Sequence, residues 1–278
     1  MTDREGDRVR DTTPELRALH EEIAALTLRV ARPLIWHDRT EGWPKRLDGG
    51  TCFFLRFERG VIGVTAHHVV SAYESAVAAN PDTVCQLRNS PAFDLPGAII
   101  ARHAARDIAT FAVSDAVLSH IEAIPLDCRE SWPPPEPQHL WLLSVCGFPE
   151  SMRVPKADRS AEFQAWGALA AVESVTRDEI LISYDPAIIK PTAWAPRLPP
   201  VGFNLSGCSG GPVLVHGTWN GLHRWFAVGL IAGGPQEEKK QGESAEFDMI
   251  RLSRINIIQP DGTIRQPVHD TGGWLPGF

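Results

Sequence analysis

The chain has 278 residues, 43% of them hydrophobic and 22% charged, a composition typical of globular proteins. Its formal net charge of −7 argues against the broad basic surface on which nucleic-acid binding depends, so we expect no nucleic-acid partner. The length suffices to bury a core without a disulfide or metal staple. Five cysteines at irregular spacing predict neither a disulfide framework nor a zinc site.

We expect no secretory signal in the N-terminal residues. Residues 1–13 are polar and charged and lack the apolar core of a secretory signal. The longest apolar stretches, such as residues 139–148, are too short to span a bilayer. We therefore expect a protein of the bacterial cytoplasm, with no membrane partner.

A helix is predicted over residues 14–30, within an N-terminal segment of residues 1–30. Pro14 suits its first turn, and Thr12 or Thr13 can cap it. Its apolar residues recur at steps of three and four; they are Leu16, Leu19, Ile23, Leu26 and Val30. This stripe predicts packing on the body of the protein. It also fits docking to a regulatory partner or self-association.

From residue 31 onward, short apolar or alternating runs are separated by Gly, Pro, Asp and Asn, which predicts a β-sandwich or barrel. The runs are residues 51–57, 61–66, 98–101, 108–113, 140–146, 180–184, 212–215 and 225–232. Residues 71–79 read as a short helix. Residues 131–138 (SWPPPEPQ) hold four prolines and predict an extended linker. The linker separates two similar halves, residues 31–130 and 139–260, and residues 261–278 form a tail.

Three short stretches carry residues suited to nucleophilic catalysis. They are VTAHHVV at residues 64–70, RDIATF at residues 106–111 and GCSGGP at residues 207–212. Each alone is weak, because a glycine-rich stretch is often a tight turn and a single histidine is often structural. In chain order they supply His68, Asp107 and Ser209, which is the order of the chymotrypsin-like layout.

Together these stretches resemble trypsin-like serine proteases, most closely the short bacterial members without a propeptide. Residues 50–54 (GTCFF) resemble the strand that precedes the histidine in that family, and residues 147–149 (GFP) resemble a turn early in its second half. The resemblance covers residues 45–260. It implies an all-β fold of two six-stranded antiparallel β-barrels, here with an added N-terminal α-helix, and no metal or organic cofactor.

The resemblance also implies a role for each residue. Ser209 is the expected nucleophile, His68 the base that takes its proton, and Asp107 the acid that orients the imidazole. The backbone amides of Gly207 and Ser209 are the expected oxyanion hole. We therefore expect a serine endopeptidase that acts on a protein or peptide. The alternative is a partner-gated or inactive protease-like module that binds peptides.

Other assignments stay open from the residues alone. His67 competes with His68 as the base; because neighbouring side chains diverge in a strand that leads into a turn, only one of the two should face Ser209. Asp94 and Asp115 are alternatives to Asp107. The histidine pair could also suggest a metal site, but no third ligand has convincing spacing.

The stretch GCSGG also matches the nucleophile elbow of α/β-hydrolases. Their chain order would need Asp248 or Asp261 as the acid and then His269. That fold also needs a helix directly after the serine, whereas residues 212–215 (PVLV) are strand-like.

By the same resemblance, Phe203 lies at the base of the primary substrate pocket with Asn204 beside it. Ala232, Gly233 and Gly234 form the wall that pairs with the substrate backbone. Since no acidic residue is expected at the pocket base, we predict cleavage after an uncharged side chain.

Two cysteines depart from the family pattern. Cys52 replaces a small residue in the GTCFF strand and is expected in the core. Cys208 stands where secreted trypsin-like enzymes carry an aspartate, which pairs with a new N-terminal amine after zymogen cleavage. That switch cannot operate here, so we predict an enzyme that is competent as synthesised or is switched by a partner.

Overall fold

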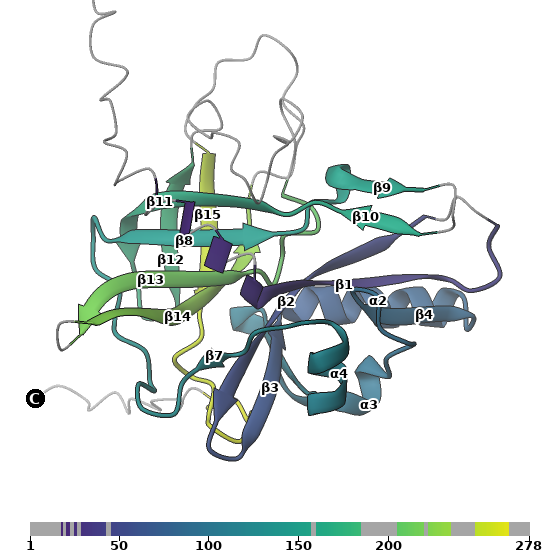
Figure 1. Cartoon of the computed structure of the whole chain (residues 1–278), viewed down its shortest axis with the longest axis horizontal. Coiled ribbons are helices and arrows are strands. Elements are labelled where there is room, and N and C mark those ends of the chain that lie inside the picture. The colour runs from purple at the N-terminus through teal and green to yellow at the C-terminus, as the bar shows by residue number, and fades with distance from the viewer. Residues whose placement is uncertain are drawn as a thin grey trace, which may run out of the picture.

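The computed structural model describes residues 29–42, 46–156, 160–184, 205–219, 222–234 and 248–266, together with residues 18, 21–22 and 25–26. These residues form two units, a sheet on the right of Figure 1 and a barrel on its left. We call them the N-terminal sheet and the C-terminal barrel. Among the described residues, no helix is long and apolar enough to cross a membrane. The cytoplasmic location stays a prediction.

The N-terminal sheet has seven strands and carries three helices. The strands are β1 (Ala31–Asp38), β2 (Asp48–Phe57), β3 (Gly60–Thr65), β4 (Thr83–Leu87), β5 (Ile99–His103), β6 (Ile108–Ala112) and β7 (Leu126–Asp127). Their order is β4-β1-β2-β3-β6-β5, with β7 paired to β2. The helices are α2 (His67–Ala79), α3 (Leu95–Ala98) and α4 (Asp115–His120), and the 3₁₀ turn η1 (Ala104–Arg106) precedes β6.

The C-terminal barrel closes through six antiparallel strands in the order β11-β12-β15-β14-β13-β8. They are β8 (Leu142–Gly147), β11 (Trp166–Val175), β12 (Glu179–Tyr184), β13 (Pro212–Trp219), β14 (Leu222–Gly233) and β15 (Asp248–Arg254). After β8, the 3₁₀ turn η2 (Glu150–Met152) leads into an arm of two short strands, β9 (Arg153–Pro155) and β10 (Ala161–Phe163).

The mostly β fold is confirmed, and so is one six-stranded antiparallel barrel. A second closed barrel over residues 31–130 is not shown, because within this fully described sheet β4 pairs only with β1 and β5 only with β6. The predicted helix over residues 14–30 lies mostly outside the described residues and is likewise not shown. Its described positions, such as Ala18 and Ala25, have helical backbone.

Two cores hold the units. In the sheet, β2 is buried over six successive residues, from Gly50 to Leu55, so both faces of this strand are covered. The edge of the Phe54 ring packs on Phe111, with ring centroids 6.3 Å apart. The barrel core is formed by inward side chains; its largest members include Trp166, Leu143, Ile180 and Leu252. Alternation of these side chains across each strand is what the predicted runs encode.

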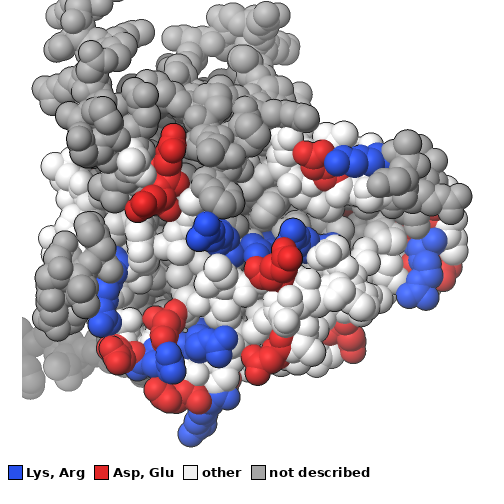
Figure 2. Space-filling model, in the orientation of Figure 1, with Lys and Arg blue, Asp and Glu red and all other residues white. Residues whose placement is uncertain are grey.

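Two segments cross between the units. The proline-rich residues 131–138 form neither helix nor strand, and Trp132 packs on Phe57 with ring centroids 5.2 Å apart. After β15 the chain returns to the sheet, where Ile258 and Ile264 enter its core and Thr110 donates a hydrogen bond to the Gly262 carbonyl at 2.6 Å. The C-terminal segment up to residue 266 therefore wraps the first unit. On the face shown in Figure 2, basic and acidic side chains of the described residues are interspersed.

Candidate active site

Helix α2 begins at the two adjacent histidines. Val69, Val70 and Tyr73 are buried and anchor it on the sheet. The predicted helix over residues 71–79 was thus four residues too short, and the histidines do not lie in a strand leading into a turn. Successive helical residues point about 100° apart, so only one of the two histidines faces a given neighbour.

The start of α2 is capped by Asp107, not by a residue of its own segment. Ala66 at the N-cap makes no side-chain hydrogen bond. Instead, the His67 amide donates to the Asp107 carbonyl at 3.1 Å, and the His68 amide donates to Asp107 Oδ1 at 2.8 Å. These bonds satisfy donors that a helix leaves without intrahelical partners. One carboxylate thereby fixes the backbone that carries His68.

The same carboxylate also holds the His68 ring. Asp107 Oδ2 lies 2.6 Å from Nδ1 of His68. Because a carboxylate accepts, Nδ1 carries the proton in the neutral imidazole and Nε2 keeps its lone pair. The Asp107 side chain is only 15% exposed, whereas that of His68 is 50% exposed. The imidazole is therefore held through Nδ1, and half of the His68 side chain is exposed.

Asp107 is itself supported from both units. It follows η1 with a left-handed φ of 54°, a conformation that aspartate tolerates better than most residues. The preceding guanidinium, of Arg106, forms an ion pair with Asp178 of the hairpin between β11 and β12, and a hydrogen bond of 3.4 Å to Asn256. Arg106 thus ties the turn before Asp107 to the C-terminal barrel.

The loop that carries Ser209 packs against the start of α2. The Thr51 amide donates to the Ser209 carbonyl at 2.9 Å. A Cβ on Gly210, which has a φ of +84°, would lie 2.2 Å from the Thr51 carbonyl and 2.8 Å from the Ala66 amide. Only glycine fits this position. The loop therefore packs against Ala66, which is two residues before His68 in the sequence. The structure thus brings His68, Asp107 and Ser209 to the place where the two units meet, which we call the joint.

Two amides of this loop have no acceptor within the described part of the chain. The amides of Cys208, Gly210 and Gly211 donate to the carbonyls of Leu205, Ile231 and Cys208. The amides of Gly207 and Ser209, the predicted oxyanion donors, are the exceptions. Two such amides beside a serine form a candidate site for an oxyanion.

Ser209 Oγ and His68 Nε2 make no hydrogen bond to each other or to any other described residue. Nucleophile and base often lie further apart without substrate than they do in the reacting complex. Backbone contacts hold the segments that carry Ser209 and His68 next to each other, but the hydrogen bond between Ser209 Oγ and His68 Nε2 is not formed.

The competing residues have other partners. Nε2 of His67 lies 3.4 Å from Ser71 Oγ on its own helix. Asp94 accepts the Gly97 amide at the start of α3, and Asp115 lies in the first turn of α4. The described residues contain no group of three His, Cys, Asp or Glu side chains that could hold a metal. The segment after Ser209 is β13, which contradicts the helix that a nucleophile elbow requires.

The predicted substrate-pocket residues are only partly described. Phe203 and Asn204 lie outside the described residues. Ala232 and Gly233 end β14, and Gly234 follows it. A Cβ on Gly234 would meet the Leu205 side chain at 2.5 Å, and one on Gly233 would meet the Arg251 guanidinium at 3.6 Å. The Arg251 guanidinium itself forms an ion pair with Glu179 at 3.3 Å.

All five cysteines are free and buried. Burial raises the pKa of the Cys208 thiol above its ordinary range, and also that of Cys52. Cys208 packs directly against Gly147: a Cβ added to Gly147 would lie 2.7 Å from the Cβ of Cys208. It is a small core residue behind the Ser209 loop.

Sequence reasoning missed two residues at this site. Thr51 Oγ1 donates to the Gly207 carbonyl at 2.7 Å, and the Glu150 amide donates to the Ser206 carbonyl at 2.8 Å. Thr51 was noticed only as part of the GTCFF strand, and nothing in the sequence marks Glu150. Both act on the backbone of a loop distant in sequence.

Comparison of the sequence with protein-family models and with curated proteins finds no match. The assignment of a function therefore depends on the residues and their geometry.

Proposed function

We propose that the chain is a serine endopeptidase, with Ser209 as nucleophile, His68 as base and Asp107 as the orienting acid. The observation that carries the proposal is the double contact of the Asp107 carboxylate with the His68 amide and with its Nδ1. This arrangement leaves Nε2 as the basic atom, next to a serine loop in which two amides lack acceptors among the described residues. A merely structural histidine would not require both features.

The proposed reaction follows from this geometry. Ser209 Oγ attacks the peptide carbonyl carbon while Nε2 of His68 takes its proton. The amides of Gly207 and Ser209 stabilise the oxyanion, and Asp107 stabilises the imidazolium. His68 then gives the proton to the leaving amine as the C–N bond breaks. Water hydrolyses the acyl-enzyme by the same route in reverse, which releases the acid and restores Ser209.

The substrate we propose is a protein or peptide whose backbone pairs with the end of β14, at Ala232 and Gly233. We predict a preference for an uncharged residue before the cleaved bond, as the resemblance implies. A peptide-library profile dominated by Arg or Lys at this position would contradict the preference.

Labelling with a fluorophosphonate probe tests the proposal, because the probe reacts with an activated serine. We expect labelling of the wild-type chain and none of Ser209→Ala or His68→Ala. Failure of a folded wild-type chain to label would contradict an active free enzyme.

A second candidate is a partner-gated or inactive peptide-binding module, and the open contact between Ser209 and His68 favours it. In that case the free chain stays unlabelled and still binds peptide. Isothermal titration of the wild-type chain against a peptide library, followed by product analysis, would then show binding without cleavage; Ser209→Ala binds without cleavage under either proposal.

A further inference from the structure

The orientation of two peptide units decides whether the Ser209 loop can bind an oxyanion. In a trans peptide the C=O and N–H bonds point in opposite directions. The Ser206 carbonyl accepts the Glu150 amide at 2.8 Å, so the Gly207 amide points the other way. The Cys208 carbonyl accepts the Gly211 amide at 2.9 Å, which turns the Ser209 amide outward in the same manner. Rotation of the first unit would put a carbonyl where a donor is needed.

The first of these peptide units is held by η2 and its preceding turn. Glu150 contacts Ser206 twice, since the Ser206 hydroxyl also donates to the Glu150 carboxylate at 3.0 Å. A Cβ on Gly207, which has a φ of +88°, would lie 2.9 Å from the Glu150 amide and 2.6 Å from the Phe148 carbonyl. The loop therefore has one way to lie against this turn.

The peptide unit between Gly207 and Cys208, which follows the first one directly, is held by Thr51 of the N-terminal sheet. Its hydroxyl accepts the Phe148 amide at 3.0 Å and donates to the Gly207 carbonyl at 2.7 Å. Thr51 is fully buried. One hydroxyl thus connects the turn after β8 with the Ser209 loop, across the joint between the two units.

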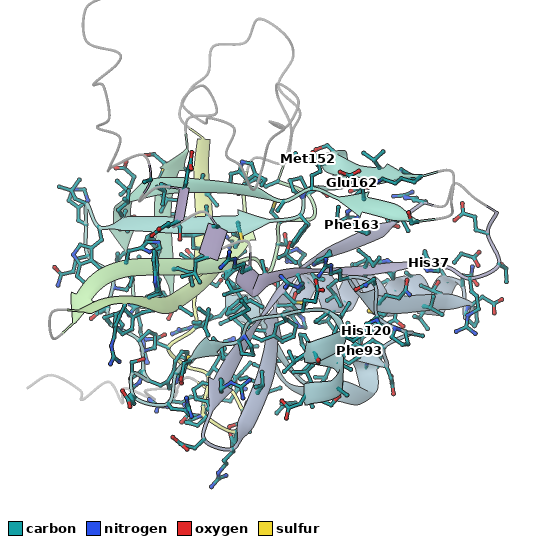
Figure 3. The ribbon with its side chains drawn as sticks, viewed as in Figure 1. His37, Phe93, His120, Met152, Glu162 and Phe163 are labelled. Atoms are coloured by element: carbon teal, nitrogen blue, oxygen red, sulfur yellow. The ribbon has the colours of Figure 1, made fainter. Side chains whose placement is uncertain are left out.

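The turn is itself anchored at both ends. Met152, labelled in Figure 3 at the base of the arm, is buried in the barrel core. Phe163, labelled at the end of β10, packs with Phe148, Cys146 and Ala31 of β1. The Arg153 guanidinium donates to the Leu47 carbonyl at 2.7 Å beside this joint. A turn fixed in this way can hold the loop without help from a charged pair.

We propose that Glu150 and Thr51 are positioning residues that keep the Gly207 amide pointing into the oxyanion site. This inference rests on the proposed protease function and deepens it. Position 208 is a buried cysteine, so this chain has no aspartate there to form the aspartate–amine pair of a zymogen switch. In our proposal, the contacts of Glu150 and Thr51 orient the loop in place of that pair. The donor site is then formed by the fold itself, with no proteolytic activation.

Glu150→Pro tests the backbone contact, because the ring Cδ replaces the amide hydrogen, which removes the donor and displaces the Ser206 carbonyl. Pro149 has φ −56° and ψ 141°, the extended conformation that a following proline favours, and position 150 is the first of η2. Glu150→Ala is the matched control, since it removes the side chain and keeps the amide. We expect the fluorophosphonate labelling rate to fall about 10²–10³-fold in Glu150→Pro and less than tenfold in Glu150→Ala.

A pair of variants at Thr51 gives a second test that does not depend on Glu150→Pro folding. Thr51→Val keeps the shape and removes the hydroxyl, whereas Thr51→Ser keeps the hydroxyl. We expect Thr51→Val to slow labelling at least tenfold and Thr51→Ser to restore most of the rate. The pH midpoint of the labelling rate should stay at the wild-type value in all variants, because His68 and Asp107 are untouched.

The outcomes separate the two proposals. Wild-type labelling that depends on Ser209 and His68, with equal rates in Glu150→Pro and Glu150→Ala and in the two Thr51 variants, overturns the positioning roles and leaves the protease proposal standing. A folded wild-type chain that never labels overturns both. Slow labelling accompanied by loss of the native near-UV circular dichroism in Glu150→Pro and Thr51→Val would show a general structural role, which contradicts the inference.

Discussion

The two units hold their parts of the candidate site in different ways. In the N-terminal sheet, the Asp107 carboxylate of the same unit contacts His68 twice, and the Asp107 carbonyl accepts the amide of the adjacent His67. In the C-terminal barrel, the Ser209 loop is held by barrel residues, through Ile231 and Glu150, and also by Thr51 of the sheet, which contacts Ser209 and Gly207. The base is therefore local in its support, whereas the nucleophile depends also on the joint.

This difference separates two kinds of sensitivity. A change within the sheet that spares Asp107 should leave the base in place. A change at the joint should displace the serine and its amides before it affects the histidine. The substitutions below test this contrast.

The largest expected effect is that of Asp107→Asn. An asparagine offers an NH₂ group as well as an acceptor, so it no longer imposes the tautomer with the proton on Nδ1. We expect the labelling rate of Ser209 to fall on the order of 10⁴-fold, while the fold is kept, since the amide oxygen can still accept the His68 amide. NMR of the imidazole nitrogens reports the tautomer directly. An unchanged labelling rate would remove Asp107 from the site.

Gly210→Ala tests the joint. The added Cβ would meet the Thr51 carbonyl at 2.2 Å and the Thr65 hydroxyl at 2.4 Å, and the φ of +84° disfavours any side chain. We expect a loss of about 2–4 kcal/mol in the free energy of unfolding, from overpacking and left-handed strain together. Urea unfolding measures it, with Gly217→Ala as a control because its Cβ would meet nothing within 4 Å.

Gly210→Ala should differ from Asp107→Asn in its effect on the histidine. In Gly210→Ala the imidazole should keep the wild-type tautomer in the NMR spectrum, while Ser209 no longer labels. If the histidine signals change as much as the labelling does, the two supports are not separate.

Sequence patterns predicted the elements that carry their own local signals. The apolar or alternating runs at β2, β3 and β6 and the GCSGGP turn lie where they were expected. Two of the strands that were missed lack such signals: β1 contains Pro33, and β11 (WGALAAVESV) is rich in small residues with low strand propensity. The early start of α2 was also missed, because its cap is supplied by Asp107, 39 residues away.

The same reasoning explains which site residues the sequence could not indicate. His68, Asp107 and Ser209 are chemically distinctive and lie in short recognisable stretches. Thr51 and Glu150 act through backbone amides and carbonyls, which every residue has. Only the packing of the two units reveals that these contacts orient the Ser209 loop.

Buried thiols on both sides of the joint predict a stability that falls at alkaline pH. Burial raises the pKa of Cys146 and Cys208 in the barrel well above its ordinary value. Burial also raises the pKa of Cys128 in the sheet, to about 12. In the unfolded chain these thiols ionise near pH 8.5. In the folded state the thiols stay protonated to higher pH. The free energy of unfolding therefore keeps its full value below pH 8.5 and decreases as the pH rises above it. Each thiol contributes about 1.4 kcal/mol per pH unit.

Urea unfolding at pH 8, 9 and 10 measures this slope. Cys208→Ala should make the slope shallower by the share of one thiol. A slope that is the same in the variant and in the wild-type chain would show that the Cys208 thiol does not stay neutral in the fold. At pH 8 the buried thiols should also resist iodoacetamide, and rapid alkylation of Cys208 would contradict its burial.

The smallest expected effect concerns a charged contact that ties the Asp107 turn to the barrel, the ion pair of Arg106 with Asp178. The Arg106 side chain is only 10% exposed, but that of Asp178 is 54% exposed, so solvent screens the attraction. We expect a coupling of about 0.5–1 kcal/mol from a double-mutant cycle of Arg106→Met and Asp178→Asn in urea unfolding. Because the His68–Asp107 contacts lie within the sheet, both single variants should label within about threefold of the wild-type rate. A much larger loss of labelling would mean that the base, like the nucleophile, depends on the barrel for its position.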